Sequence, residues 1–77
     1  MERTAGPDPA LAGTLRAFRE AAGRSQEDVA HSAGVTIAAY GRIERAQSDP
    51  AWSTVVRIAN ELGVPLEKLG RAVDARR

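Results

Sequence analysis

Cysteine is absent from this 77-residue sequence, and histidine, tryptophan, tyrosine, phenylalanine and methionine occur once each. Without cysteine, disulfide bonds and thiolate chemistry are excluded, and zinc loses its commonest structural ligand. The single histidine, His31, is expected on the exposed side of a helix rather than as a ligand or a proton switch. The serines and carboxylates form no nucleophile–base pattern and no metal-binding pattern. The sequence therefore predicts no enzyme activity, no metal site and no cofactor.

Long apolar runs are absent as well. The nearest to one, residues 55–59, is interrupted by Arg57, whereas a membrane-spanning helix needs about 20 apolar residues. Residues 1–9 lack the apolar centre of a signal peptide. These observations predict a cytoplasmic protein with no membrane partner.

The length of the chain leaves room for one domain with a small core. Hydrophobic residues make up 43% of it, and no alternating strand pattern is present. Helical spacings recur instead, so we expect a compact all-α fold. The expected organisation is a flexible N-terminal arm over residues 1–7, a helical domain over residues 8–74 and a tail over residues 75–77. Arg3 in the arm could reach a minor groove, but disorder is the favoured interpretation.

The first expected helix begins at Asp8 as the N-cap, with Pro9 at the first helical position. Apolar residues then recur every three or four positions on one face, and Gly23 ends the helix. Those apolar residues are Leu11, Leu15, Phe18 and Ala22.

Two short helices with a tight turn between them are expected next. Ser25 caps the first of the two, with Asp28 three residues later in a shortened capping box. Gly34 ends it, and Thr36 then caps a third helix that runs to about Arg45. So short a turn makes the helices cross steeply, and Gly34 permits the positive φ of the turn. The third helix is thereby held where a major groove about 12 Å wide could receive it.

The third helix has two distinct faces. The inward face consists of Ala39, Tyr40 and Ile43, and we expect the Tyr40 hydroxyl to reach outward. The opposite face is expected to be exposed. It consists of Thr36, Ile37, Ala38, Gly41 and Arg42, with Arg45 at its far end.

Two more helices are expected after Pro50, one ending at Gly63 and the other following Val64 and Pro65. Apolar residues with helical spacing define the fourth helix, and they are Trp52, Val55, Val56, Ala59 and Leu62. Since Trp52 and Phe18 both lie on apolar stripes, we predict that both are core residues.

The fifth helix carries an apolar stripe of Leu66, Leu69 and Val73. Such a stripe is either a last piece of core or a contact with a second copy of the chain. We expect both: Leu66 points inward, and Leu69 and Val73 lie nearer a partner.

Many short elements follow one another in a specific order between Leu15 and Leu69. They are Arg19, Gly23, Ser25-Gln26, Val29-Ala30, Gly34-Val35, Arg42-Ile43-Glu44-Arg45, Pro50 and Leu62-Gly63-Val64. Together they resemble the lambda-repressor-like, XRE-type helix-turn-helix family, which includes phage repressors and Cro. The resemblance implies a five-helix DNA-binding domain that is usually used as a symmetric dimer.

The resemblance also implies roles for individual residues. Arg19 and Glu44 would form a structural ion pair between the first and third helices, and Gln26 would meet a DNA phosphate and support the third helix. The residues at base-reading positions are Thr36, Ile37, Ala38, Gly41 and Arg42, and those at sugar-phosphate positions are Ser25, Gln26, Arg45, Gln47 and Ser48. Phosphate contacts supply affinity and register, whereas base contacts supply sequence choice.

Two features depart from the family pattern. The family has glycine after the third helix, where this chain has Ala46. Because an alanine at positive φ is strained by roughly 1 kcal/mol, this helix end is expected to differ. The reading face is also poor in hydrogen-bonding groups, and Arg42 is its only long polar side chain. Sequence preference would then depend on one arginine, apolar contacts and DNA deformability.

The sequence thus predicts a transcriptional regulator that binds a palindromic DNA operator as a single-domain homodimer. No small-molecule effector is expected, because the chain has no room for an effector pocket. Its size fits both restriction-modification controllers and small phage-type repressors. The alternative is an antitoxin or adaptor that uses the same fold to bind another protein. The net charge of only +1 slightly favours that alternative.

Overall fold

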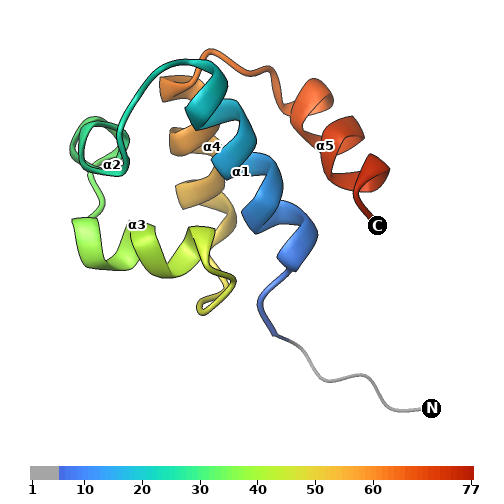
Figure 1. The fold of residues 1–77 in the computed structure, drawn as a ribbon, viewed down its shortest axis with the longest axis horizontal. Coiled ribbons are helices and arrows are strands. Elements are labelled where there is room, and N and C mark those ends of the chain that lie inside the picture. Colours follow the sequence, from blue (N-terminus) through green and yellow to red (C-terminus); the bar gives the residue numbers. More distant parts are fainter. Residues whose placement is uncertain (1–5) are drawn as a thin grey trace.

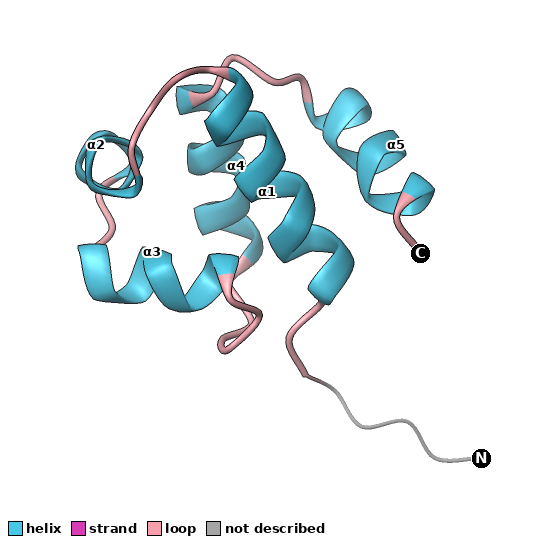
Figure 2. Ribbon diagram, in the orientation of Figure 1, coloured by secondary structure: helices cyan, strands magenta, loops and turns pink. Residues whose placement is uncertain are grey.

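In a computed structural model, residues 6–77 are described, and within them the chain forms five helices and no strand (Figure 2). The all-α, five-helix prediction is confirmed. The predicted arm falls largely on residues 1–5, which lie outside the described residues. The helices are α1 (Pro9–Ala21), α2 (Gln26–Ala33), α3 (Ile37–Glu44), α4 (Trp52–Glu61) and α5 (Leu66–Ala75).

Side chains predicted as caps begin the first three helices. A carboxylate oxygen of Asp8 accepts from the backbone N–H of Ala10 at 3.0 Å. Ser25 Oγ accepts from the N–H of Asp28 at 3.0 Å, and Thr36 Oγ1 accepts from the N–H of Ala39 at 3.1 Å. Each cap satisfies a backbone donor that the helix itself leaves unpaired.

The ends of α2 and α3 share one geometry. After α2, Gly34 has a φ of +73°, and the next N–H, of Val35, donates to the carbonyl of Ala30 at 2.9 Å. After α3, Ala46 has a φ of +57°, and the N–H of Gln47 donates to the carbonyl of Arg42 at 2.8 Å. Both are Schellman motifs with a left-handed residue. The expectation that Ala46 makes this helix end differ is therefore wrong, because the chain accepts the strain.

The helices pack in two groups around α1 and α4 (Figure 1). On one side, α2 contacts both α3 and α4, and α3 also contacts α1. On the other side, α5 contacts α1 and α4. The buried core residues come from all five helices and from the link before α5; they are Leu15, Val29, Ala30, Ala33, Tyr40, Ile43, Val55, Ile58, Ala59, Val64, Leu69 and Val73.

The predictions for the fourth and fifth helices need correction. Trp52 is 66% exposed, because it lies in the first turn of α4 beyond the edge of the core. On α5 the expected order is reversed: Leu66 is 39% exposed, whereas Leu69 and Val73 are buried against the other helices. Phe18 is partly buried against the core, as predicted.

The C-terminal residues are ordered against α1. Helix α5 extends to Ala75, one residue beyond the predicted domain end. The Arg77 guanidinium donates to both carboxylate oxygens of Asp8, at 3.2 and 2.7 Å. The expected tail therefore contacts the start of the first helix. Among residues 6–77, no helix combines the length and apolar character that crossing a membrane requires.

Candidate nucleic-acid interface

The position of α3 is set by its connection to α2. The turn between them consists of Gly34, Val35 and Thr36, and Gly34 adopts the left-handed conformation that lets the chain reverse. Val35 packs against the core beside this turn. As a result α3 lies at the edge of the molecule, on the side away from α5 (Figure 1).

A buried ionic network holds the C-terminal end of α3. Arg19 on α1 donates from Nε to Glu44 Oε2 at 2.8 Å and from Nη2 to Glu44 Oε1 at 3.0 Å. Gln26 on α2 donates from Nε2 to Glu44 Oε1 at 2.9 Å. The side chains of Arg19 and Glu44 are only 12% and 1% exposed. Two planar groups with paired hydrogen bonds fix both distance and orientation, so α3 is locked to α1 and α2.

The network also changes the acid–base properties of its members. Burial is the largest single influence on Glu44 and by itself would raise its pKa. The pKa nevertheless lies below its ordinary value, because the charge of Arg19, the hydrogen bond from Gln26 and above all the hydrogen bonds from Arg19 act together against burial. The same hydrogen bonds raise the pKa of Arg19. The pair is therefore fully ionised at neutral pH.

Tyr40 lies next to this network, and its predicted orientation was wrong. Its side chain is completely buried, and the hydroxyl does not reach outward. Within the described part of the chain, this hydroxyl oxygen has no hydrogen-bond partner. Burial strongly raises the pKa of Tyr40, and the nearby carboxylate of Glu44 adds to the effect.

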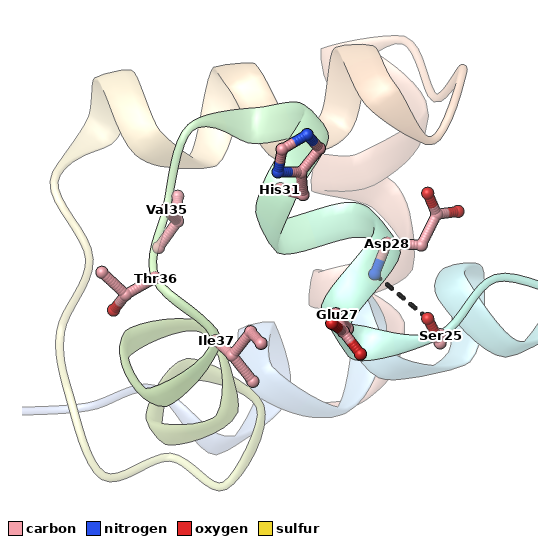
Figure 3. Close-up of a pocket in the computed structure, with 7 residues that line it drawn as sticks. All are labelled: Ser25, Glu27, Asp28, His31, Val35, Thr36 and Ile37. Atoms are coloured by element: carbon pink, nitrogen blue, oxygen red, sulfur yellow. Dashed lines mark hydrogen bonds between the residues drawn. The ribbon is translucent and has the colours of Figure 1, made fainter.

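The outer face of α3 is exposed over its first half. Thr36, Ile37 and Ala38 are all exposed, and the side chain of Ile37 is 52% accessible. Arg42 is exposed one turn further along the same face. The close-up of the adjoining pocket places Thr36 and Ile37 at the start of α3, opposite Glu27 and His31 of α2 (Figure 3). His31 is exposed, as expected.

Gly41 differs from the other predicted base-reading residues, because it is buried. The guanidinium of Arg45 covers it: a methyl group at Gly41 would lie 2.9 Å from Arg45 Nη1. Gly41 therefore lies on the predicted face, but the side chain of Arg45 covers it. A DNA base could approach its backbone only after Arg45 moved.

The residues predicted to contact phosphate surround α3 but differ in availability. Ser25 is exposed, although its hydroxyl oxygen already accepts the capping bond. Gln26 and Ser48 are half-buried, and Gln47 is exposed. One amide hydrogen of Gln26 is used by Glu44, which leaves the second amide hydrogen as a donor.

Comparisons with known proteins agree with this geometry. The profile of a family described as "Helix-turn-helix domain" matches residues 10–72. The chain belongs to this helix-turn-helix family. No curated protein matches the chain in sequence.

Solved structures show similar folds. The hypothetical transcription factor NHTF from Neisseria is 30% identical, with a TM-score of 0.74 over 90% of this chain and 85% of that one. The restriction-modification controller protein C.AhdI from Aeromonas hydrophila is 28% identical, with a TM-score of 0.76 over 79% of this chain and 92% of that one. The clp gene regulator ClgR from Corynebacterium glutamicum is 19% identical, with a TM-score of 0.85 over 88% and 72% of the two chains, and this likeness concerns the fold alone.

Two arginines that support the helix-turn-helix were not singled out from the sequence. Arg57 on α4 donates from Nε to the carbonyl of Ala33 at 3.0 Å, which satisfies an acceptor at the end of α2. Arg24 donates to Asp28 at 2.7 Å and to the carbonyl of Glu61 at 2.6 Å, and so joins α2 to the end of α4. The four-residue spacing of Arg24 and Asp28 is a signal that could have revealed the first contact. The contacts with backbone carbonyls have no sequence signal.

Proposed function

We propose that this protein is a sequence-specific DNA-binding transcription regulator that inserts α3 into the major groove. One observation carries the proposal: the inner face of α3 is fixed by the Glu44 network, while its outer face is exposed at Thr36, Ile37, Ala38 and Arg42. A rigidly held helix with a free outer face is what base recognition in a groove requires. The similarity to a restriction-modification controller and to a hypothetical transcription factor supports the same role.

The exposed face offers both apolar and polar contacts to DNA bases. Ile37 and Ala38 can pack against thymine methyl groups, and Arg42 can donate to the acceptors of guanine. The phosphate contacts would come from the ends of α2 and α3, through Ser25, Gln26, Gln47 and Ser48. The low net charge of +1 means that local donors, rather than a strongly basic surface, would supply the affinity.

A symmetric dimer would double these few base contacts. The candidate surface for pairing is an apolar groove between α5 and the starts of α1 and α4, which includes Leu11, Val55 and Leu66 and is flanked by the exposed Trp52. Helix α5, which forms one side of this groove, lies across α1 from α3 (Figure 1). Pairing through α5 would therefore leave both copies of α3 free. Such a dimer would read half-sites about 10–10.5 base pairs apart, or about 34–36 Å.

The biological class that fits best is a small regulator of the restriction-controller or phage-repressor type. It would act where the DNA is, in the cytoplasm predicted from the sequence, and the role requires no catalysis. The similarity to C.AhdI, which extends over 92% of that protein, supports the first of the two types.

Selection of bound sequences from a random pool of double-stranded DNA tests the proposal. We expect a palindromic site to be enriched, and its affinity to fall linearly with salt on logarithmic scales, because bound phosphates release counterions. A pool that stays unenriched at low salt would overturn the proposal. It would favour the antitoxin or adaptor alternative.

Two charged variants test the dimer. Leu66→Glu changes an exposed side chain, so it should give a folded monomer that binds the selected site weakly. Leu69→Glu is the matched control, because it buries a charge in the core and should unfold the domain instead. Sedimentation of the wild-type protein as a monomer at high micromolar concentration would count against the dimer. So would a Leu66→Glu variant that still dimerises.

A further inference from the structure

The side chain of Arg45 is folded back along α3. Its Nη1 atom lies 2.9 Å, and its Cζ and Nη2 atoms 3.5 Å, from the position that a Cβ atom on Gly41 would occupy. The guanidinium therefore rests on the bare backbone of Gly41, four residues earlier in the helix, and buries it. Any side chain larger than hydrogen at position 41 would force the guanidinium to move.

A second contact holds Arg45 in this orientation. Its Nε donates to Oε1 of Gln47 at 3.0 Å. The backbone of Gln47 is itself fixed, because its N–H donates to the carbonyl of Arg42 in the motif that ends α3. Neither Nη1 nor Nη2 of Arg45 hydrogen-bonds to any of residues 6–77. Four of the five guanidinium hydrogens thus remain available to a ligand.

The folded-back side chain of Arg45 brings its free charge to the middle of the exposed face. Ile37, Gly41 and Arg45 are spaced by four residues and form one stripe, beside the stripe of Ala38 and Arg42. Folding back carries the guanidinium about one helical turn, or about 5.4 Å, toward the start of α3. The middle of the exposed face then carries the guanidinium of Arg45 as well as Arg42, whereas the sequence predicted Arg45 at the far end of this face.

We propose that Arg45 is a second base-reading residue, which donates to O6 and N7 of a guanine in the major groove, and that Gly41 is its positioning residue. The inference rests on the proposed function, since it requires α3 to bind DNA. A planar fork of donors matches the two acceptors of guanine, and a guanidinium held in advance loses little freedom when it binds. This role replaces the phosphate contact that the sequence predicted for Arg45.

Base reading and phosphate contact predict different effects of an Arg45 substitution on binding to different DNA sequences. If Arg45 reads guanine, Arg45→Ala should weaken binding to the selected site about 10- to 100-fold. It should leave binding unchanged for a site with that one base pair replaced. Arg45→Lys keeps the charge but loses the fork, so it should behave like the alanine variant at this base pair. A phosphate contact would instead weaken all sequences equally and would tolerate lysine.

The Gly41→Ala variant tests positioning. It should remove the preference at the same base pair as Arg45→Ala does, while the melting temperature rises, because alanine is the better helix former. In the Arg45→Ala background, Gly41→Ala should change the preference no further. The matched control is Gly13→Ala on α1, where an added methyl would likewise lie 3.1 Å from an arginine nitrogen, Nη1 of Arg76. That control should leave DNA binding unaltered.

The outcomes distinguish a failure of the proposed function from a failure of the role proposed for Arg45. If the wild-type protein selects no DNA, the proposed function and this inference both fail. If it selects a site but Arg45→Ala weakens all sequences equally, the proposed function stands and the inference is overturned. Additive effects of Gly41→Ala and Arg45→Ala on base preference would overturn the positioning role of Gly41.

Discussion

The two faces of α3 differ sharply in burial and in charge pairing. The inner face buries Tyr40, Ile43 and the ionised Glu44, whose carboxylate accepts hydrogen bonds from two neighbouring helices. The outer face exposes Ile37 and Arg42. A helix of eight residues is too short to be stable alone, since isolated helices below about 12 residues are marginal. The packing of the inner face therefore keeps α3 helical and fixed in place, and the outer face can present its side chains to DNA only because of that packing.

Removing the carboxylate of Glu44 should have the largest effect on this contrast. Glu44→Ala leaves the guanidinium of Arg19 buried without its partner, which costs about 3–5 kcal/mol of folding free energy where burial is complete. Thermal or urea unfolding measures this loss. The double variant Glu44→Ala with Arg19→Met should recover part of it, because no unpaired charge then remains. Purely additive losses would show that the two side chains are not energetically coupled.

Arg42→Ala should affect DNA binding and not folding stability. Its side chain is exposed, so unfolding should be almost unchanged, while binding to the selected DNA site should weaken by about 1–3 kcal/mol at one base position. Titration of the site and of its single-base variants measures this effect. Equal weakening on all sequences would assign Arg42 to a phosphate, and unchanged binding would exclude it from the interface.

Lowering the pH should remove the folding stability that the ionised Glu44 contributes on the inner face. Because the pKa of Glu44 is lowered in the folded state, its stabilising contribution is complete above its unfolded value of about 4.3 and is lost as pH falls through the folded value. Each unit of difference between the two values corresponds to about 1.4 kcal/mol. Below pH of about 4, the stability of the wild type should therefore fall more steeply than that of Glu44→Gln. Parallel profiles would show that Glu44 does not contribute to the acid response. Asp8 and Asp28, whose pKa values are also lowered, titrate equally in both proteins.

The smallest predicted effect concerns the end of α3. Ala46 has a φ of +57° and is the only residue other than glycine with a positive φ among residues 6–77. Ala46→Gly should relieve that strain and stabilise the domain by about 0.5–1 kcal/mol, after the greater flexibility of glycine in the unfolded chain is subtracted. Thermal unfolding checks this. A destabilised variant would mean that the methyl group of Ala46 makes contacts worth more than the strain.

Features fixed by neighbouring residues were predictable from the sequence. The caps at Asp8, Ser25 and Thr36 and the left-handed turn at Gly34 depend on side chains and backbone within a few positions. The pairing of Arg19 with Glu44 is different, because it joins α1 to α3 across 25 positions. It was reached through the resemblance to a family and not through helical spacing.

The errors share another cause. Helical spacing shows which residues lie on one face, but not which faces meet or where along a helix the core ends. Trp52 belongs to the apolar stripe of α4 but lies beyond the core, and Leu66 has the same relation to α5. Helical spacing places Gly41 on the open face, but it does not show that the side chain of Arg45 folds back and covers it.

The exposed indole of Trp52 makes the protein its own optical reporter. It is the only tryptophan of the chain, and it flanks the apolar groove between α5 and the starts of α1 and α4. In a free monomer its fluorescence should have the long-wavelength maximum of a hydrated indole and be quenched readily by iodide. Pairing of two chains through the groove would shift the emission to shorter wavelength and protect it from the quencher. A dilution series of the unlabelled protein would then give the dissociation constant of the pair directly, without an attached dye.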